Sequence, residues 1–381
     1  MNNFQFICGS RMLRIEDLGN EAMNDAFRSF YNDYFINNQL SWSNLWALKD
    51  NFFDEIETRQ IPFTNTDYSE CKARYHDGFF NDFTIAWQNE LDMGNYKNAI
   101  LIWEKAIDLA KDWEIKRGRH IHKGTPLYFQ AVTCLENDEV EVGFALMHEA
   151  YLEDFIRNGN NDNFSSPGKS FVEFKVSDDT AFYRAKLEEI KQFFENEFLS
   201  TTFSFDDFRR RFSENINIPI LIKYQFLLNI FRIWKAYRRF DGFNLTNPMV
   251  GLLYMEAIFS LCKLIEPIYR VTTHTNPHSN KDVYESLCET NPNIFNIITM
   301  RNFGGGGFIR EMHNIYENNR VNIGGHSHSL GDVEKDTLLA YGFRNLSAHD
   351  LYQNDFVNQN IKGILQSVFR TLFKSVTSSH G

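Results

Sequence analysis

The chain has 381 residues, a length that predicts two or three domains. Hydrophobic residues make up 43% of it and charged residues 23%, which excludes a wholly disordered or collagen-like chain. The net charge of −11 argues against a protein that coats nucleic acid non-specifically, because such binding needs an excess of Lys and Arg. The sequence contains only 8 prolines, and long stretches lack both Pro and Gly, so we expect an all-α fold.

Five scattered cysteines, none of them in a Cys-x-x-Cys pair, predict reduced thiols rather than a disulfide framework or a zinc site. Polar and charged side chains interrupt the two longest apolar runs, residues 219–234 and 248–269. A membrane span needs about 20 nearly uncharged residues, so we interpret both runs as buried helices. The amino terminus lacks the continuous apolar core of a signal peptide. We therefore expect a cytoplasmic protein without a membrane partner, and no motif predicts a metal or a cofactor.

The region from about 80 to 157 contains two related helical patterns. Small and aromatic residues at spacings of three and four share one helix face: Tyr96, Ala99, Trp103 and Ala106. This pattern and the Gly-Asn turn before it resemble the second helix of a tetratricopeptide repeat. A weaker echo follows 44 residues later, at Val140, Gly143, Met147 and Ala150. Because the repeat usually spans about 34 residues, we predict repeat-like helical hairpins rather than a regular solenoid.

Composition divides the chain near residue 200. We assign residues 1–200 to an amino-terminal helical domain, in which apolar clusters also predict helices over the first 75 residues. Residues 206–240 contain eight Lys or Arg against three Asp or Glu, so we begin a second domain at 205 and extend it to 381. That domain is predicted to contain two long helices, a loop-rich insert at about 291–331, and a final helical pair.

A polar motif lies within the final helical pair. Arg344, Asn345 and His349 stand between apolar runs that predict buried helix on both sides. Polar groups on such an element need partners or a function. An Arg and a His separated by four residues, with Asn directly after the Arg, resemble the signature of HEPN-domain ribonucleases, the higher eukaryotes and prokaryotes nucleotide-binding superfamily. The resemblance covers roughly residues 215–376.

The resemblance implies a HEPN-like helical bundle in which two copies of the motif meet across a homodimer interface in one composite cleft. It implies a metal-independent endoribonuclease that acts in prokaryotic defence or as a toxin, with RNA as substrate. The amino-terminal helical region would then bind a protein or ligand trigger. The basic stretch supplies the candidate RNA-binding residues, which are Arg209, Arg210, Arg211, Lys235, Arg238 and Arg239.

The chemistry of the motif agrees with this activity. RNA is cut without metal when its own 2′-hydroxyl attacks the adjacent phosphate, which requires a proton-transfer group and a positive clamp. His349 supplies the first and Arg344 the second, because a guanidinium matches the geometry of phosphate oxygens. On a continuous helix Asn345 and His349 share one face, so Asn345 could orient the His. Glu256 and Asp350 are candidates for supporting these groups.

Several other patterns are weaker. Arg117 and His122 show the same spacing, but Gly118 disfavours an ordered helix there, and we interpret that copy as a coincidence. The four glycines of 304–307 lack the Gly-Lys-Ser/Thr of a phosphate-binding loop. The nearby pair of histidines, at 326 and 328, lacks the further ligands that a metal site needs.

Two other functions remain open on the sequence alone. Arg344 and His349 could pair with Asp350 or Glu256 and only staple the bundle. The protein would then be a non-catalytic interaction protein, with the hairpins binding a peptide and the bundle serving dimerisation. A third interpretation is a nucleotide sensor that holds a phosphate without cleaving it.

Overall fold

The computed structural model describes residues 5–8, 11–14, 81–118, 120–175, 183–199, 203–243, 248–288, 307–323, 325–345 and 355–377. The described elements are helical except for two short hairpins, which confirms the predicted all-α class. The chain forms two compact units, unit 1 (residues 1–168) and unit 2 (residues 169–381).

Unit 1 begins with a small hairpin in which β1 (Gln5–Cys8) pairs antiparallel with β2 (Arg11–Arg14). This segment is therefore extended, although we predicted only helices in the first 75 residues. The helices expected from residue 15 to 75 lie outside the described residues.

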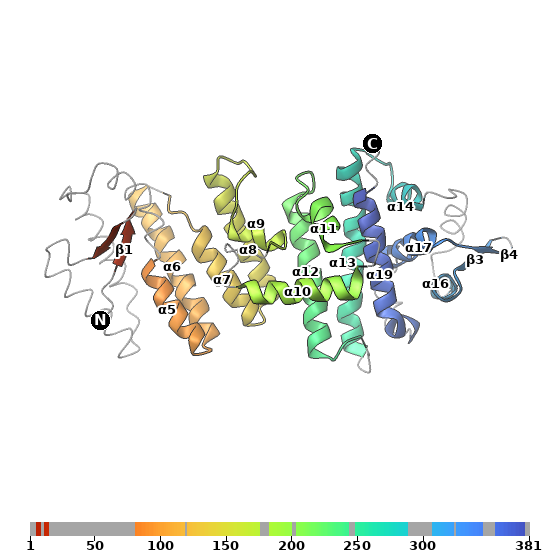
Figure 1. Cartoon of the computed structure of the whole chain (residues 1–381), viewed down its shortest axis with the longest axis horizontal. Helices are drawn as coiled ribbons and strands as arrows, with labels where there is room; N and C mark the ends of the chain where they lie inside the picture. Colours follow the sequence, from red (N-terminus) through yellow and green to blue (C-terminus); the bar gives the residue numbers. More distant parts are fainter. Residues whose placement is uncertain are drawn as a thin grey trace. The chain divides into compact units, whose positions relative to one another are not determined.

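Four helices follow as two pairs: α5 (Asn81–Asp92) with α6 (Tyr96–Arg117), and α7 (Gly124–Glu136) with α8 (Val140–Arg157) (Figure 1). Each pair is joined by a turn with one residue in the left-handed region, Gly94 at φ 72° and Asp138 at φ 66°. Successive helices pack on each other along the series, as short connections require. The hairpins expected over 80–157 are present, while their kinship with the tetratricopeptide repeat stays a prediction.

Aromatic side chains from three helices form the core of unit 1. Trp87 of α5 stacks on Phe129 of α7 with centroids 4.6 Å apart, and Trp103 of α6 lies 5.5 Å from the same ring. The buried indole of Trp87 donates a hydrogen bond to Thr133 Oγ1 at 2.8 Å. Gly143 lets α8 approach α7 closely, since a Cβ there would stand 2.7 Å from the Leu135 side chain. The small residues singled out in the sequence thus serve close helix packing.

The boundary between the units lies before the one that we predicted at 200–205. After α9 (Pro167–Val172), α10 (Arg184–Phe198) packs against helices of unit 2 rather than unit 1. The reason is its apolar face, since Phe194 and Phe198 contact Phe369 at 5.3 and 4.7 Å. The composition shift near residue 200 therefore marks a change in surface charge and not the edge of the core.

Unit 2 is built mainly from long helices, of which α12, α13 and α19 lie side by side (Figure 1). Its remaining elements in chain order are α11 (Phe205–Phe208), η3 (Arg209–Ser213), α12 (Ile220–Arg239), α13 (Pro248–Thr273), α14 (Asn280–Cys288), α16 (Gly307–Asn318), β3 (Arg320–Ile323), β4 (His326–Ser329), α17 (Asp332–Asn345) and α19 (Asp355–Thr377).

Phenylalanine rings fill the core of unit 2. Phe194 is fully buried and contacts Phe208, Phe226 and Phe369 at centroid distances of 5.1, 5.8 and 5.3 Å. These rings come from α10, α11, α12 and α19, so one cluster joins four elements. Aromatic residues make up 15% of the chain, and a large cluster of their rings lies in this core.

A buried ion pair fixes α17 on α19. Arg370 donates from Nε to Asp336 Oδ2 at 2.5 Å and from Nη2 to Asp336 Oδ1 at 2.8 Å. The Asp336 side chain is only 7% exposed, so this bidentate pair satisfies a carboxylate that could not otherwise be buried. It positions the helix that ends in Arg344.

The predicted loop-rich insert contains regular structure in its described part. α16 buries Met312 and Ile315, and β3 pairs antiparallel with β4. The expectation of loops over 291–331 was therefore wrong from residue 307 onward, because the glycines and polar residues obscured two apolar positions three residues apart. Residues 289–306 lie outside the described part of the chain.

Helix α16 packs on α19 at Gly363. A Cβ atom at this position would overlap the hydroxyl of Tyr316, so glycine alone leaves room for that ring. The Tyr316 ring also meets Phe356 edge-on at 5.5 Å, and the Lys335 ammonium lies 5.1 Å from the ring centroid. The insert is thereby docked on the final helix largely by shape.

The expectations of no membrane span and of reduced cysteines concern residues that the structure describes in part. No helix within the described ranges is long and apolar enough to cross a membrane. The three cysteines that these ranges include, Cys134, Cys262 and Cys288, are free and buried.

We expect Phe194→Ala to lower the free energy of unfolding of unit 2 by about 3–5 kcal/mol, because the truncation leaves a cavity among four elements. Leu221→Ala, at a side chain that is 54% exposed, should change it by less than about 0.5 kcal/mol. Urea denaturation followed by circular dichroism measures both. Equal effects of the two substitutions would contradict the assigned core.

Candidate functional site

The Arg344 side chain lies in the last turn of α17 and reaches α13. Its Nη2 donates to Glu266 Oε2 at 3.2 Å, and both side chains are about four-fifths buried, with exposed fractions of 21% and 20%. The partner is therefore Glu266 and not Glu256, which is exposed on the same helix. Arg344 is thus held at a defined place between α17 and α13.

The carboxylate of Glu266 is shared between two arginines. Its Oε1 accepts hydrogen bonds from Nε and Nη2 of Arg270 at 3.0 and 2.8 Å, while its Oε2 accepts from Arg344. Arg270 also donates from Nη1 to Asn276 Oδ1 at 2.7 Å. Within the described part of the chain, two permanent cations therefore face one carboxylate, which leaves this group with one positive charge in excess.

Arg344 keeps donor capacity beyond its bond to Glu266. Its Nε is buried and has no hydrogen-bond partner among the described residues, and no bond within them involves Nη1. A guanidinium presents five N–H donors, so a buried one with a single partner is under-satisfied. Such a group can donate hydrogen bonds to an anion, for example to a phosphate oxygen.

The groups packed behind Arg344 are neutral. Burial raises the pKa of the Cys262 thiol far above its ordinary value, and the Arg344 charge opposes this only in part. Burial likewise raises the pKa of Tyr284, whose hydroxyl donates to the Cys262 carbonyl at 3.1 Å. A protonated, buried thiol is not a nucleophile, so Cys262 forms part of the wall and does not react.

The other residues of the motif are only partly placed. Asn345 is exposed, and its Nδ2 donates to the Tyr341 carbonyl at 3.0 Å within α17. His349 and Asp350 lie outside the described residues, since α17 is described as far as Asn345. Whether Asn345 and His349 share one helix face therefore stays a prediction.

Most of the candidate RNA-binding residues have partners in unit 2. Arg209 pairs with Glu214 at 3.1 Å, Arg210 with Asp207 at 2.6 Å, and Arg238 with Glu189 at 2.6 Å. The Lys235 ammonium lies 5.4 Å from the centroid of the Phe231 ring. Arg211 and Arg239 are exposed.

The six basic residues do not form one patch. Arg209, Arg210 and Arg211 lie in η3, whose neighbours Phe208 and Phe212 contact Phe226 in the first half of α12 at 5.3 and 4.7 Å, whereas Arg239 ends that helix thirteen residues later, or about 20 Å along the axis. Phe243 contacts both Tyr237 and Tyr254, so the end of α12 lies beside the first part of α13.

Glu266 stands twelve residues beyond Tyr254 on α13, or about 18 Å along the axis. Because α12 and α13 run antiparallel, residues 209–211 lie at the Arg344 end of the bundle. Residues 235–239 lie at the opposite end. Only the first group is therefore placed to extend a site at Arg344.

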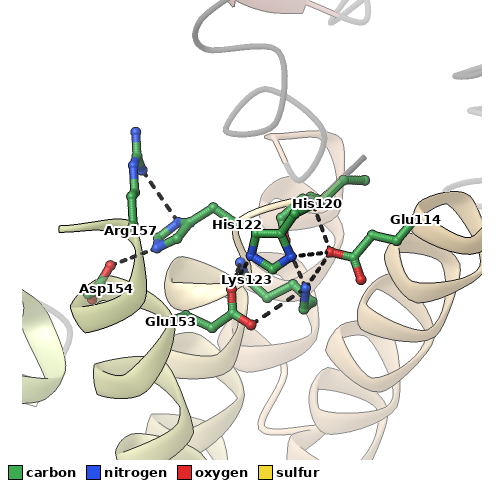
Figure 2. Close-up of polar contacts among 8 residues, drawn as sticks. Glu114, His120, His122, Lys123, Glu153, Asp154 and Arg157 are labelled. Atoms are coloured by element: carbon green, nitrogen blue, oxygen red, sulfur yellow. Dashed lines mark hydrogen bonds and ion pairs between the residues drawn. The ribbon is translucent and has the colours of Figure 1, made fainter. Parts of the chain in front are cut away.

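A second charged cluster lies in unit 1, where the chain passes from α6 to α7 (Figure 2). Gly118 ends α6 at φ 65°, as its position in the sequence indicated. The exposed His120 ring then bridges two helices, with Nδ1 2.7 Å from Glu114 Oε1 of α6 and Nε2 3.1 Å from Glu153 Oε2 of α8.

Lys123 lies at the centre of this cluster (Figure 2). Its ammonium is 2.6 Å from Glu114 Oε1 and 3.5 Å from Glu153 Oε1, and it donates to the Ile121 carbonyl at 2.8 Å. Burial alone would raise the pKa of Glu114. Hydrogen bonds from Lys123 and the Ile121 N–H, together with the neighbouring positive charges, lower that pKa below its ordinary value instead.

His122 faces α8 beside Lys123. Its Nε2 is 2.8 Å from Asp154 Oδ1, and Arg157 Nη1 lies 3.4 Å from its Nδ1 (Figure 2). A Cβ at Gly124 would stand 2.7 Å from the His122 ring and 2.8 Å from Asp154 Oδ1, so a glycine is needed beside this contact.

The charged groups of the unit 1 cluster pair with one another. Three carboxylates, those of Glu114, Glu153 and Asp154, face Lys123, Arg157 and two histidines, so with histidine counted as neutral these described groups carry no surplus positive charge. Such an arrangement ties α6 to α8. Our sequence analysis treated the Arg117–His122 copy as a coincidence. The sequence signal for this cluster is the group His120, His122 and Lys123 after the helix-ending Gly118, together with the acidic pair Glu153 and Asp154 on α8.

The described residues contain no group of three or more His, Cys, Asp or Glu side chains that could hold a metal ion. Comparison of the chain with protein-family models, with curated proteins and with solved structures finds no match.

We expect Lys123→Met to destabilise unit 1 by about 3–5 kcal/mol, because it leaves the carboxylates of Glu114 and Glu153 partly buried without their cation. His120→Ala, which removes a side chain that is 57% exposed, should cost about 1 kcal/mol or less. Thermal melting with limited proteolysis of unit 1 measures both. Wild-type melting of Lys123→Met would show that the cluster does not stabilise the fold.

Proposed function

We propose that the protein is a metal-independent endoribonuclease of HEPN type. The observation that carries the proposal is the surplus positive charge at Arg344, directly before the segment that contains His349. Among the described residues, one carboxylate faces two guanidinium groups, and Arg344 makes a hydrogen bond from Nη2 alone. A phosphate would satisfy both the charge and the donors.

In the proposed reaction His349 takes the proton of a ribose 2′-hydroxyl as that oxygen attacks the adjacent phosphorus. Arg344 stabilises the negative charge that develops on the phosphorane oxygens. The bond between phosphorus and the 5′-oxygen then breaks, and that oxygen takes up a proton. The products are a 2′,3′-cyclic phosphate and a 5′-hydroxyl end. Asn345, exposed beside Arg344, is placed to contact the same phosphate or to orient His349.

Glu266 is the positioning residue in this scheme. It accepts a hydrogen bond from Arg344 Nη2, and no bond among the described residues involves Nη1, which we propose contacts the substrate phosphate. Arg270 keeps Glu266 from drawing the whole charge of Arg344, because it occupies the other carboxylate oxygen. Exposed Arg211, at the same end of the bundle, is suited to the RNA backbone.

The proposal includes a composite site made by two copies of the chain and a setting in prokaryotic defence or toxin action. One bundle supplies few catalytic groups, and a homodimer would bring two Arg344–His349 pairs to one RNA. The amino-terminal hairpins would bind the trigger that controls cleavage.

The second candidate function is a non-catalytic interaction protein. The ion pair between Arg344 and Glu266 favours it, because a structural staple between α17 and α13 would make the same contact. The two candidates predict different behaviour of mutants at the motif.

We expect Arg344→Ala and His349→Ala each to abolish cleavage of labelled RNA in EDTA while leaving a folded protein. Both groups act on the transition state, so their loss should cost activity far more than stability. Mass spectrometry of the wild-type products should show 2′,3′-cyclic phosphate ends. Wild-type protein that never cuts RNA, together with an Arg344→Ala variant that melts many degrees lower, would establish the structural role instead.

Glu266→Gln should reduce cleavage about tenfold, the equivalent of about 1.4 kcal/mol, because the amide holds Arg344 without fixing its charge. Glu195→Gln is the matched control, since Glu195 is exposed on α10 and makes no ion pair within the described residues. Single-turnover rates at saturating RNA separate positioning from binding. A Glu266→Gln rate equal to that of the control would contradict the positioning role.

A further inference from the structure

The carboxyl-terminal half of α13 carries a row of cationic side chains beside Arg344. Lys263 stands one helical turn before Glu266 and Arg270 one turn after it, so at 100° per residue these side chains lie within about 60° of one another. Arg344 reaches the same face from α17 through its contact with Glu266. Three cations and one carboxylate therefore meet along about 10.5 Å of helix, which leaves a net positive charge among these described groups.

Lys263 and the turn after α13 add to this charge. The Lys263 side chain is exposed, and no ion pair or hydrogen bond within the described part of the chain involves its ammonium. His274, at φ 53°, turns the chain where the helix ends, and Asn276 accepts from Arg270 Nη1 at 2.7 Å, which holds the turn beside the row. Between residues 257 and 281 the sequence contains one acidic residue, Glu266, which the two arginines already engage.

An acidic side chain ends the row on one side. Glu256 is exposed on the same face of α13, seven residues before Lys263, or about 10.5 Å along the axis. Its charge repels a phosphate. A polyanion on this face would therefore extend from Lys263 toward Arg270 and not toward the start of the helix.

We infer that Lys263, Arg344 and Arg270 form a track for the phosphate backbone of single-stranded RNA, in which Lys263 contacts a phosphate next to the one at Arg344. The inference rests on the proposed function and names residues that bind its substrate. A guanidinium pairs with phosphate oxygens by its planar geometry, whereas a lysine contributes a point charge at the side of the strand. Such contacts position the strand and carry no sequence information.

The arrangement of the charges favours a nucleic-acid strand over an acidic peptide. A strand repeats one negative charge at every nucleotide, which matches a row of cations held on one helix. The charge count that singled out residues 206–240 overlooked this row, because one of its three cations comes from α17. In that basic stretch Arg209, Arg210 and Arg238 are paired with acidic residues, whereas the Lys263 ammonium is available to a ligand.

The test is the binding of a fluorescein-labelled 2′-O-methyl RNA to the full-length chain, because this RNA lacks the attacking 2′-hydroxyl. Lys263→Gln should weaken binding about fivefold in about 50 mM salt, and equally for two oligonucleotides of different sequence. The slope of log Kd against log salt concentration should fall by about 0.7, the value for one phosphate contact of a single strand. Lys97→Gln, at an exposed lysine of α6 in unit 1, is the matched control and should change neither quantity.

Glu256→Gln changes the affinity in the opposite direction. Removing the charge that ends the row should tighten binding about twofold, a change that a damaged fold does not produce. A Lys263→Gln variant with the Kd and salt slope of the wild type would overturn the inference, even if the protein cuts RNA. Polyglutamate that binds more tightly than RNA and loses this binding in Lys263→Gln would assign the row to an acidic protein, and so would also overturn it.

These outcomes are distinguishable from those that concern the proposed function. RNA binding that depends on Lys263, in a protein that never cuts unmodified RNA, would refute the ribonuclease and support the track. A wild type that binds no RNA in low salt would overturn both.

Discussion

The carboxylate of Glu266 has to serve two guanidinium groups at once. Both arginines are mostly buried at their contacts, so neither could occupy its place without a negative partner, and a single partner leaves one positive charge over. This contact holds one end of α17 on α13, and the Asp336–Arg370 pair holds the other part of α17 on α19. Among the described residues, one carboxylate thus stands where two would neutralise the pair of guanidinium groups, and the proposed function depends on this difference.

The charged cluster of unit 1 shows the opposite solution. There Lys123 is enclosed by two carboxylates, and His120 spans the same pair from the solvent side. The result is a link between α6 and α8, whereas two guanidinium groups share the one carboxylate of Glu266. This difference in charge among the described residues distinguishes a structural cluster from a candidate site.

The sequence predicts the helical class and the packing positions of unit 1 well, because small and aromatic residues at helical spacing have few other uses. It does not predict the unit boundary, because the phenylalanines of α10 indicate a buried helix face without indicating which of the two cores that face joins. It could not identify Glu266 as the partner of Arg344, because the two are 78 residues apart and only the packing of α17 on α13 brings them together. The pairing of Arg209, Arg210 and Arg238 with acidic residues was equally hidden, since a count of charges carries no information on contacts.

The contact of Tyr316 with Gly363 has a consequence for how unit 2 responds to its surroundings. A ring packed over a glycine is held by van der Waals contact and the exclusion of water, which dissolved ions scarcely weaken. The exposed ion pairs of unit 2, such as Arg210 with Asp207 and Arg238 with Glu189, are held by Coulomb attraction, which mobile ions screen over about 8 Å at physiological ionic strength. A rise in salt therefore weakens these surface pairs while α16 keeps its place on α19.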